Sequence, residues 1–387
     1  MGGIEHVSDD RMDDVREARR RFPVTDGATY LNTAAVGLAS RALGETLHRF
    51  VDRWVGSGLD FTEGETAAEH CRSMVAGLMG VEASELALIA SASAAAGLVA
   101  AQLGLARPGE NVVIGEREFS SNHFPWVLLG SKGYDVRQVP FRNGGLEPGD
   151  VERHVDRGTR IIALSGVQAA TGHRSDLPAI GEIAARAGAL VYVDGSQMVG
   201  AVPVADALEW VDVMATGNHK FLLNAGRGMG YCYLSPKARE RFTPISAGWK
   251  AARRPYESYF GPDMDLSPTA SRFDNSMSWL GAVGDEAALA VFEDYGAEAI
   301  YRRNEELAEA LRDVLTSAGW APVDLPPRNR STIVAVPLGG RDPVRVLADL
   351  RARGVVCAAR DGNLRISVHL YNHEDDLSRL GAALREL

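Results

Sequence analysis

The sequence predicts an α/β domain built on a mainly parallel sheet, followed by a smaller α+β domain. Short apolar runs with the length of buried strands alternate with helical patterns through much of the chain. The texture changes after about residue 250, where a stretch rich in Pro, Gly, aromatic and charged residues begins. The length of 387 residues also suits one large domain together with a smaller one.

Five apolar runs define the expected sheet, and each ends in small or polar residues. They cover residues 111–116, 160–167, 189–195, 211–217 and 228–234. Apolar residues at helical spacing fill residues 177–189, and a Gly lies near the end of that segment. Strands that alternate with helices favour a parallel sheet, whose ligands bind beyond the carboxyl ends of the strands.

The last third of the chain predicts a second, smaller unit. Residues 250–274 form a long loop pattern, and residues 281–319 are helical. The tail then alternates strand-like runs, "STIVAVPL" and "GVVCAARDGNLRISVHL", with helical ones. We therefore expect an N-terminal segment 1–30 packed with the small domain, a large ligand-binding domain 31–255, and a small domain 256–387.

Composition excludes several classes of protein. A net charge of −10 and a pI of about 5.5 argue against nucleic-acid or anionic-membrane partners. No stretch approaches the roughly 20 apolar residues of a membrane helix. The three cysteines lack metal or disulfide spacing, so we expect no metal site and a cytoplasmic location.

Two neighbouring strands bring a carboxylate and an amine to the same edge of the expected sheet. Asp194 ends one apolar run, and Lys220 follows the next. Alone, the acid suits a helix cap and the lysine a solvated loop. As a pair they suit pyridoxal phosphate, whose aldehyde needs an amine and whose ring nitrogen needs a carboxylate.

A phosphate group would need a cradle, and residues 89–103 supply one. Small residues precede an expected helix there, so backbone N–H groups can approach an anion. Ser91 and Ser93 add hydroxyl groups. An N-capped, Ala-rich buried helix is the alternative interpretation of the same residues.

Three motifs, in this order, resemble those of a known family: "VDGSQMVGAVPV" (193–204), "GNHKFL" (217–222) and "RISVHLYN" (365–372). The chain resembles the class V aminotransferase group of fold-type I pyridoxal-phosphate enzymes. That group includes cysteine desulfurases, C–S lyases and isopenicillin N epimerase-like proteins. The resemblance runs from residue 29 to residue 376 and implies a mainly parallel seven-stranded sheet flanked by helices.

The resemblance also implies roles for individual residues. Lys220 matches the Schiff-base lysine, Asp194 the partner of the ring nitrogen, and Arg365 the arginine that binds the substrate α-carboxylate. Asn32 is expected to border the substrate pocket. The remaining candidates for contacts with pyridoxal 5'-phosphate are Ser91, Ala92, Ser93, Phe119, Gln168, Gln197 and His219.

Three departures from the family pattern affect the expected chemistry. Phe119 replaces the His that stacks on the cofactor in many desulfurases, and a phenyl ring cannot transfer protons. The loop that would carry a nucleophilic Cys is missing, and Cys357 falls in an apolar run. Gly217 replaces a Ser that helps to hold the phosphate. In place of the family's cross-subunit segment stand Asn275 and Ser276, our candidates for contacts across a homodimer with shared active sites.

We therefore expect an enzyme that acts on a small-molecule amino acid and favour a C–S lyase working by β-elimination without a persulfide Cys. An aminotransferase or an epimerase is the alternative. A catalytically silent relative is disfavoured by the intact Lys220, Asp194 and Arg365. A nicotinamide-dependent dehydrogenase is disfavoured because "GRGMG" (226–230) precedes a strand rather than a helix.

Overall fold

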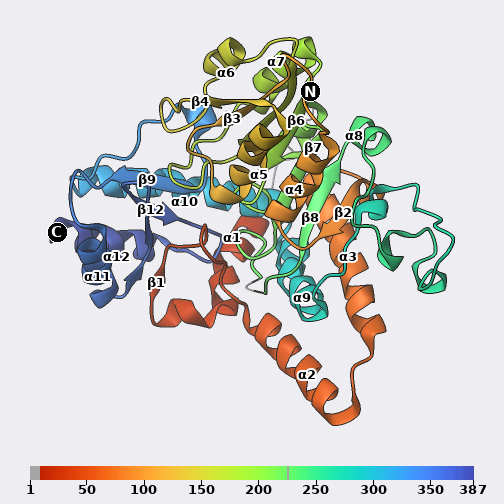
Figure 1. Cartoon of the computed structure of the whole chain (residues 1–387). Helices are drawn as coiled ribbons and strands as arrows, with labels where there is room; N and C mark the ends of the chain where they lie inside the picture. Colours follow the sequence, from red (N-terminus) through yellow and green to blue (C-terminus); the bar gives the residue numbers. More distant parts are fainter. Residues whose placement is uncertain (1–8, 225) are drawn as a thin grey trace.

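The structure is a computed structural model that describes residues 9–224 and 226–387, and it is centred on a seven-stranded sheet (Figure 1). The strand order is β2-β8-β7-β6-β5-β3-β4, and only β8 opposes its neighbours. The strands are β2 Leu86–Ile89, β3 Asn111–Gly115, β4 Asp135–Val139, β5 Thr159–Ser165, β6 Leu190–Asp194, β7 Val213–Gly217 and β8 Gly230–Leu234. The predicted mainly parallel sheet is confirmed.

Helices cover both faces of this sheet (Figure 1). Those of the described chain are α1 Asp9–Glu17, α2 Arg41–Ser57, α3 Phe61–Met79, α4 Ala92–Gln102, α5 Phe124–Val127, α6 Pro148–His154, α7 Leu177–Ala187, α8 Pro236–Arg241, α9 Trp279–Tyr295, α10 Ala297–Ser317, α11 Pro343–Ala352 and α12 Glu374–Arg385. Alternate strand residues point to opposite faces. Ile161 and Ala163 of β5 join one buried cluster with α4, whereas Ile162 and Leu164 join another with α3, α7 and α9.

Each of the five apolar runs became a strand of the sheet, but two strands had no such signal. β2 is only four residues long and leads directly into the Ala-rich start of α4. β4 lies at the edge of the sheet and is largely solvent-facing, so its sequence, "DVRQV", lacks the apolar character of a buried strand.

A second, antiparallel sheet lies in the C-terminal part of the chain. Its order is β11-β12-β9, formed by Ala358–Arg360, Asn363–Ser367 and Ile333–Pro337. Near the N-terminus, β1 (Thr29–Tyr30) pairs in parallel with β10 (Val355–Val356). The helical stretch after residue 280 forms two helices that meet at Gly296, whose φ of +79° favours glycine. The domain boundaries themselves stay a prediction. The helix α9, which falls within the predicted small domain, packs against α3 of the predicted large domain.

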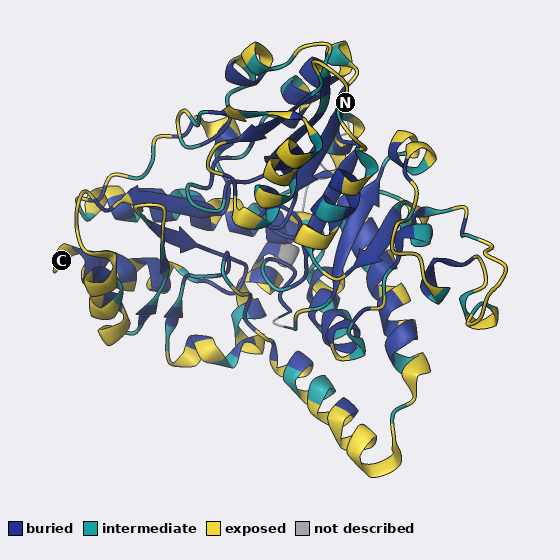
Figure 2. Ribbon diagram, in the orientation of Figure 1, coloured by how far each residue is buried: buried dark blue, intermediate teal, exposed yellow. Residues whose placement is uncertain are grey.

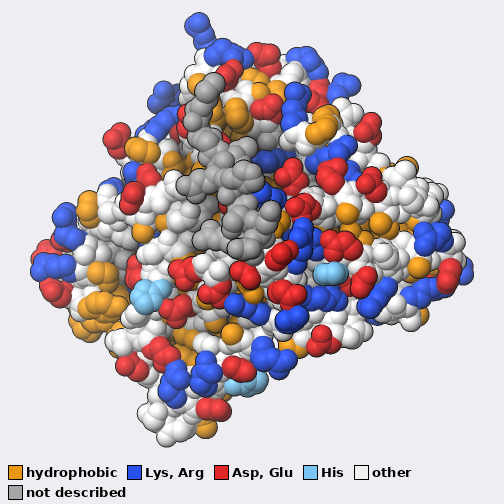
Figure 3. All heavy atoms as spheres, turned by 180° about the vertical axis from the view of Figure 1, so that it is seen from behind, with side chains coloured by type: hydrophobic (Ala, Val, Ile, Leu, Met, Phe, Trp, Pro, Cys, Tyr) orange, Lys and Arg blue, Asp and Glu red, His pale blue; other side chains and the backbone are white. Residues whose placement is uncertain are grey.

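The surface has one projecting helix and a face of mixed charge. α2 projects from the body, and its far end is exposed (Figures 1 and 2). On the reverse face, acidic and basic side chains are interspersed (Figure 3). Among the described residues, no helix combines the length and apolar character needed to cross a membrane.

Candidate active site

A cavity of about 620 Å³ lies where the parallel strands of the central sheet end. Segments that follow β2, β3, β5, β6 and β7 all contribute to its lining. β2 runs in the same direction as β7 because both oppose β8, so its end reaches the same edge. This edge is where ligands of open α/β sheets bind.

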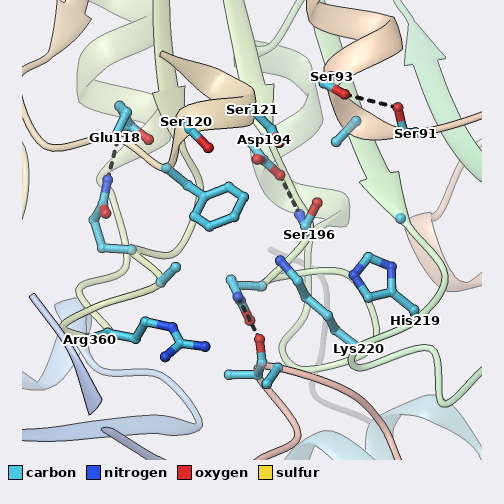
Figure 4. A pocket seen from close by; sticks show the side chains of 18 of the residues that line it. Ser91, Ser93, Glu118, Ser120, Ser121, Asp194, Ser196, His219, Lys220 and Arg360 are labelled. Atoms are coloured by element: carbon cyan, nitrogen blue, oxygen red, sulfur yellow. Dashed lines mark hydrogen bonds between the residues drawn. The ribbon is translucent and has the colours of Figure 1, made fainter. Parts of the chain in front are cut away.

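Lys220 and Asp194 meet in this cavity (Figure 4). Asp194 is the last residue of β6, and its backbone pairs in register with Ala215 of β7, five residues before Lys220. Burial lowers the pKa of the Lys220 amine, and the nearby Asp194 carboxylate partly opposes that shift. The Lys220 Nζ lies 5.5 Å from the centre of the Phe119 ring. A lysine with a lowered pKa is more often neutral, as a base or nucleophile must be.

The loop that carries Lys220 is fixed from beneath by a buried acid on α9. Asp285 accepts hydrogen bonds from Asn218 Nδ2 at 3.0 Å, Asn224 Nδ2 at 2.6 Å and the Tyr231 hydroxyl at 2.8 Å. Burial raises the pKa of Asp285 to about 7. From the other side Gly37 donates its N–H to the His219 carbonyl at 3.0 Å.

Gly37 must be a glycine for this approach. A Cβ at that position would lie 2.3 Å from the Lys220 carbonyl oxygen, which is far inside contact distance. The N-terminal segment and the lysine loop therefore touch backbone to backbone.

The start of α4 forms the expected anion cradle. Ser91 caps the helix by accepting from Ala94 N at 3.1 Å, and its hydroxyl lies 3.0 Å from that of Ser93. His219 lines the same cavity (Figure 4). Burial, with Lys220 and Arg227 nearby, lowers the pKa of His219 to about 4, so its imidazole is neutral at neutral pH. The free helix N–H groups and the two hydroxyls suit a phosphate.

Arg365 is a buried cation without a carboxylate partner among the described residues. Its side chain, on β12, is 2% exposed and donates to the Ala169 carbonyl at 3.0 Å and to Asn32 Oδ1 at 3.4 Å. Its Nε is buried and has no partner among the described residues. Burial lowers the pKa of Arg365 to about 10, and the neighbouring Arg360 adds to this effect. Such a guanidinium is stabilised by a carboxylate that arrives with a ligand.

The comparisons with known proteins agree with this geometry. The model of the family "Aminotransferase class-V" matches residues 30–380. The chain belongs to this family. It is 26% identical to a probable cysteine desulfurase of Methanothermobacter thermautotrophicus, over 82% of this chain and 83% of the relative.

Two further comparisons span nearly all of this class-V chain. Identity to isopenicillin N epimerase of Streptomyces clavuligerus is 26%, over 97% of this chain and 98% of the relative. A solved cystine C–S lyase in complex with cysteine persulfide superposes with a TM-score of 0.82 at 18% identity, covering 95% of this chain and 99% of that one. The chain is thus an enzyme of the fold-type I class, which confirms the predicted fold and the predicted cofactor, pyridoxal 5'-phosphate.

The cavity of this class-V enzyme fits that cofactor. The Gln197 side chain donates to the Ala34 carbonyl at 3.0 Å, while its buried Oε1 has no partner among the described residues and could accept from a ring hydroxyl. Ser91 and Ser93 at the start of α4 suit the phosphate, and Asp194 and Lys220 suit the ring nitrogen and the aldehyde. These residues and Ala92, Phe119, Gln168, His219 and Arg365 all line the cavity, although their roles stay predictions.

Three predicted site residues lie outside the cavity lining. The Oδ1 of Asn32 accepts a hydrogen bond from the Arg365 guanidinium. Asn275 donates to Ser246 Oγ at 3.0 Å. Ser276 lines a separate pocket with Trp249 and Tyr259. The cross-subunit role of Asn275 and Ser276 therefore stays a prediction.

Sequence reasoning missed five charged residues that line the cavity. They are Arg117, Glu118, Arg227, Arg360 and Asp361. Glu118 directly precedes Phe119, and an acid next to a predicted cofactor contact was the signal available for it. The other four lie in loops, in a hairpin turn or at the end of the short strand β11, where no sequence pattern marked them as part of the cavity.

Glu118 organises the wall behind Phe119. Its carboxylate accepts from Ser165 N at 2.9 Å, Gln168 Nε2 at 2.9 Å and Asn122 Nδ2 at 3.2 Å, and also from the Ser165 hydroxyl. Burial raises the pKa of Glu118 to about 7 despite these donors. Glu118 thereby fixes Gln168, the residue predicted to approach the cofactor or substrate.

Proposed function

We propose that this class-V enzyme cleaves the C–S bond of a cysteine-type amino acid by β-elimination, without a nucleophilic cysteine. The observation that carries the proposal is the tight turn at residues 361–362, between β11 and β12. Because two residues join these strands just before Arg365, there is no loop there that could carry a nucleophilic cysteine. Among the described residues, no cysteine lines the cavity. Burial raises the pKa of the Cys357 thiol to about 12, which makes it a poor nucleophile.

The chain's own residues supply substrate binding and proton transfer. Arg365 binds the α-carboxylate through its planar guanidinium, which suits a bidentate pair. Lys220, whose amine pKa is lowered by burial, removes the proton from Cα. Once the bond from Cβ to sulfur breaks, the Lys220 ammonium can return that proton to the leaving thiolate. Phe119 cannot serve as the acid, since its ring has no ionisable proton.

Pyridoxal phosphate, when bound, supplies an aldehyde for the substrate amine and a ring that withdraws electrons from Cα. Asp194, the partner of that ring nitrogen, keeps the nitrogen protonated. Its own Oδ1 is oriented by the Ser196 N–H at 2.9 Å. Two buried side chains, Gln168 and Gln197, complete the polar wall around the reacting carbon.

Amino transfer or epimerisation is the second candidate function. The similarity to isopenicillin N epimerase, at 26% identity over 97% of this chain, favours epimerisation as much as the desulfurase relatives favour C–S chemistry. All three reactions begin with loss of the Cα proton to Lys220. They differ in where the next proton or bond change occurs.

Product analysis separates these reactions. The holoenzyme is incubated with L-cysteine and S-alkyl cysteines, and pyruvate and released thiol or sulfide are measured. We expect equal amounts of both products, complete loss in Lys220→Ala, and unchanged rates in Cys357→Ser. Amino transfer to a keto acid, or exchange of the Cα proton with inversion and without pyruvate, would show that the elimination proposal is wrong.

The same proposal includes a homodimer with shared active sites. Apolar side chains outside the cavity lining are exposed, among them Val55 on α2 (83% exposed) and Phe260 (90% exposed). Residues 249–260 do not line the cavity of a single described chain, and Trp249 packs with Tyr256 and Tyr259 instead. A second copy would cover such surfaces and bring Asn275 and Ser276 toward a neighbouring cavity.

A further inference from the structure

We propose that Arg360 binds a carboxylate on the substrate's side chain, so that the enzyme prefers amino acids with an acidic side chain, such as a cysteine whose sulfur carries a carboxyalkyl group. The inference rests on the proposed function in one respect, because it takes Arg365 as the site of the α-carboxylate. It then gives the substrate a second anionic end. Arg360 was absent from the sequence-based candidates.

The strand register directs Arg360 and Arg365 to the same side. In the β11–β12 hairpin, Ala358 pairs with Arg365 and Arg360 pairs with Asn363. Residues two apart on a strand share a face, so Arg360 and Arg365 are diagonal neighbours on one face. Both side chains line the cavity, and Figure 4 shows Arg360 pointing into it.

A two-residue turn holds Arg360 at this place. Asp361 and Gly362 have φ angles of +50° and +76°, as the favoured two-residue hairpin turns require. The Asp361 carboxylate pairs with Arg117, which also lines the cavity. The charge of Arg117 is therefore satisfied within the chain.

Arg360 lacks such a partner. Its Nη1 donates to the Ala359 carbonyl at 2.7 Å, and no carboxylate in the described chain lies within ion-pair distance of it. It stands near enough to Arg365 to lower the pKa of that group. Two like charges side by side repel each other unless an anion lies between or beside them. A substrate with two carboxylates would relieve this repulsion.

Arg227, another cation of the cavity, belongs to its other end. Among the described residues, five cationic and three acidic side chains line the cavity. Arg227 acts on His219 and Lys220, lowering the pKa of each, and so lies toward the phosphate cradle. In Figure 4, Arg360 and His219 lie on opposite sides of Lys220. The excess positive charge at the Arg365 end is thus left for the substrate.

The test compares acids with their isosteric amides. Calorimetric titration of the holoenzyme uses the α-methyl derivatives of aspartate and glutamate, and those of asparagine and glutamine. These ligands have no Cα proton, so binding is measured without turnover. We expect at least one acid to bind about tenfold more tightly than its amide, because charge-assisted hydrogen bonds exceed neutral ones. Arg360→Gln should abolish that preference and leave amide binding within about twofold.

Arg117→Gln is the matched control, because it removes a guanidinium from the same cavity that is already paired. It should retain the preference for the acid. The proposal is overturned if the wild type binds acid and amide alike, if Arg360→Gln keeps the preference, or if Arg117→Gln loses it equally. Failure of the pyruvate and thiol assay with an intact acid preference would overturn the lyase proposal alone.

Discussion

Burial acts on Lys220 and Glu118 in opposite directions. It disfavours the charged form of each, so the lysine pKa falls and the carboxyl pKa rises to about 7. Lys220 faces the cavity, whereas Glu118 is held by four donors in the wall behind it. The lowered pKa of Lys220 helps it to act as a base. The burial of Glu118 instead reduces the stability of the fold when its carboxyl group is charged.

Glu118 should make stability fall as pH rises. Its pKa lies above the usual 4.5 in the folded enzyme, so the folded state keeps a proton that the unfolded state releases. The contribution is complete below about pH 4.5 and is lost by about pH 7, on the order of 3 kcal/mol at most. In Glu118→Gln this loss should disappear. Urea unfolding of both proteins between about pH 5 and pH 8 measures it.

The difference between wild type and Glu118→Gln cancels the titration of other groups, including Asp285. Glu209→Gln, at an exposed glutamate, is the matched control and should leave the pH profile unchanged. A constant difference between wild type and Glu118→Gln over this range would contradict the prediction.

At the scale of elements, the sequence predicted the strands that carry the chemistry better than the contacts between them. Asp194 and Lys220 follow β6 and β7, whose apolar runs have the length and ending of buried parallel strands. The contact of Asn32 with Arg365 joins residues 333 positions apart. Asp285 lies in a helical pattern that shows nothing of its three amide and hydroxyl donors. Such contacts depend on how elements pack.

Asp285 should couple α9 to cofactor binding. Asp285→Asn leaves one oxygen to accept three hydrogen bonds, so at least one buried donor loses its partner. We expect a loss of about 1–3 kcal/mol in the free energy of unfolding. Because Asn218 precedes His219 and Lys220, we also expect weaker retention of pyridoxal phosphate, measured by visible absorbance after dialysis.

Glu286→Gln changes the next residue, which pairs with His70 at the surface, and should alter neither quantity. Restored retention at saturating cofactor would agree with a positioning role for Asp285. Reduced stability with unchanged affinity for the cofactor would show that the buried acid supports the fold only.

For the whole molecule, local sequence patterns predicted the central strands of the large sheet but not its edge strand or the short strands outside it. The edge strand β4 is mostly solvent-facing, and β1 and β10 have two residues each, too few for a periodic signal. The sequence indicated that a loop of the family is missing before Arg365, but it did not predict the tight turn at 361–362. Its consequence, two arginines on one face, depends on a register that the sequence does not specify.

Assembly is the remaining property of the whole molecule, and the exposed tip of α2 gives it a test. We expect the 41.5 kDa chain to sediment at twice its mass. Val55→Asp places a charge on a side chain that is 83% exposed in the single chain, and it should shift sedimentation toward the monomer with loss of cofactor. Val344→Asp, on α11, is the matched control, because Val344 is also an exposed valine, with 75% of its surface accessible. A wild type that remains monomeric at micromolar concentration with full activity would refute the shared-site homodimer.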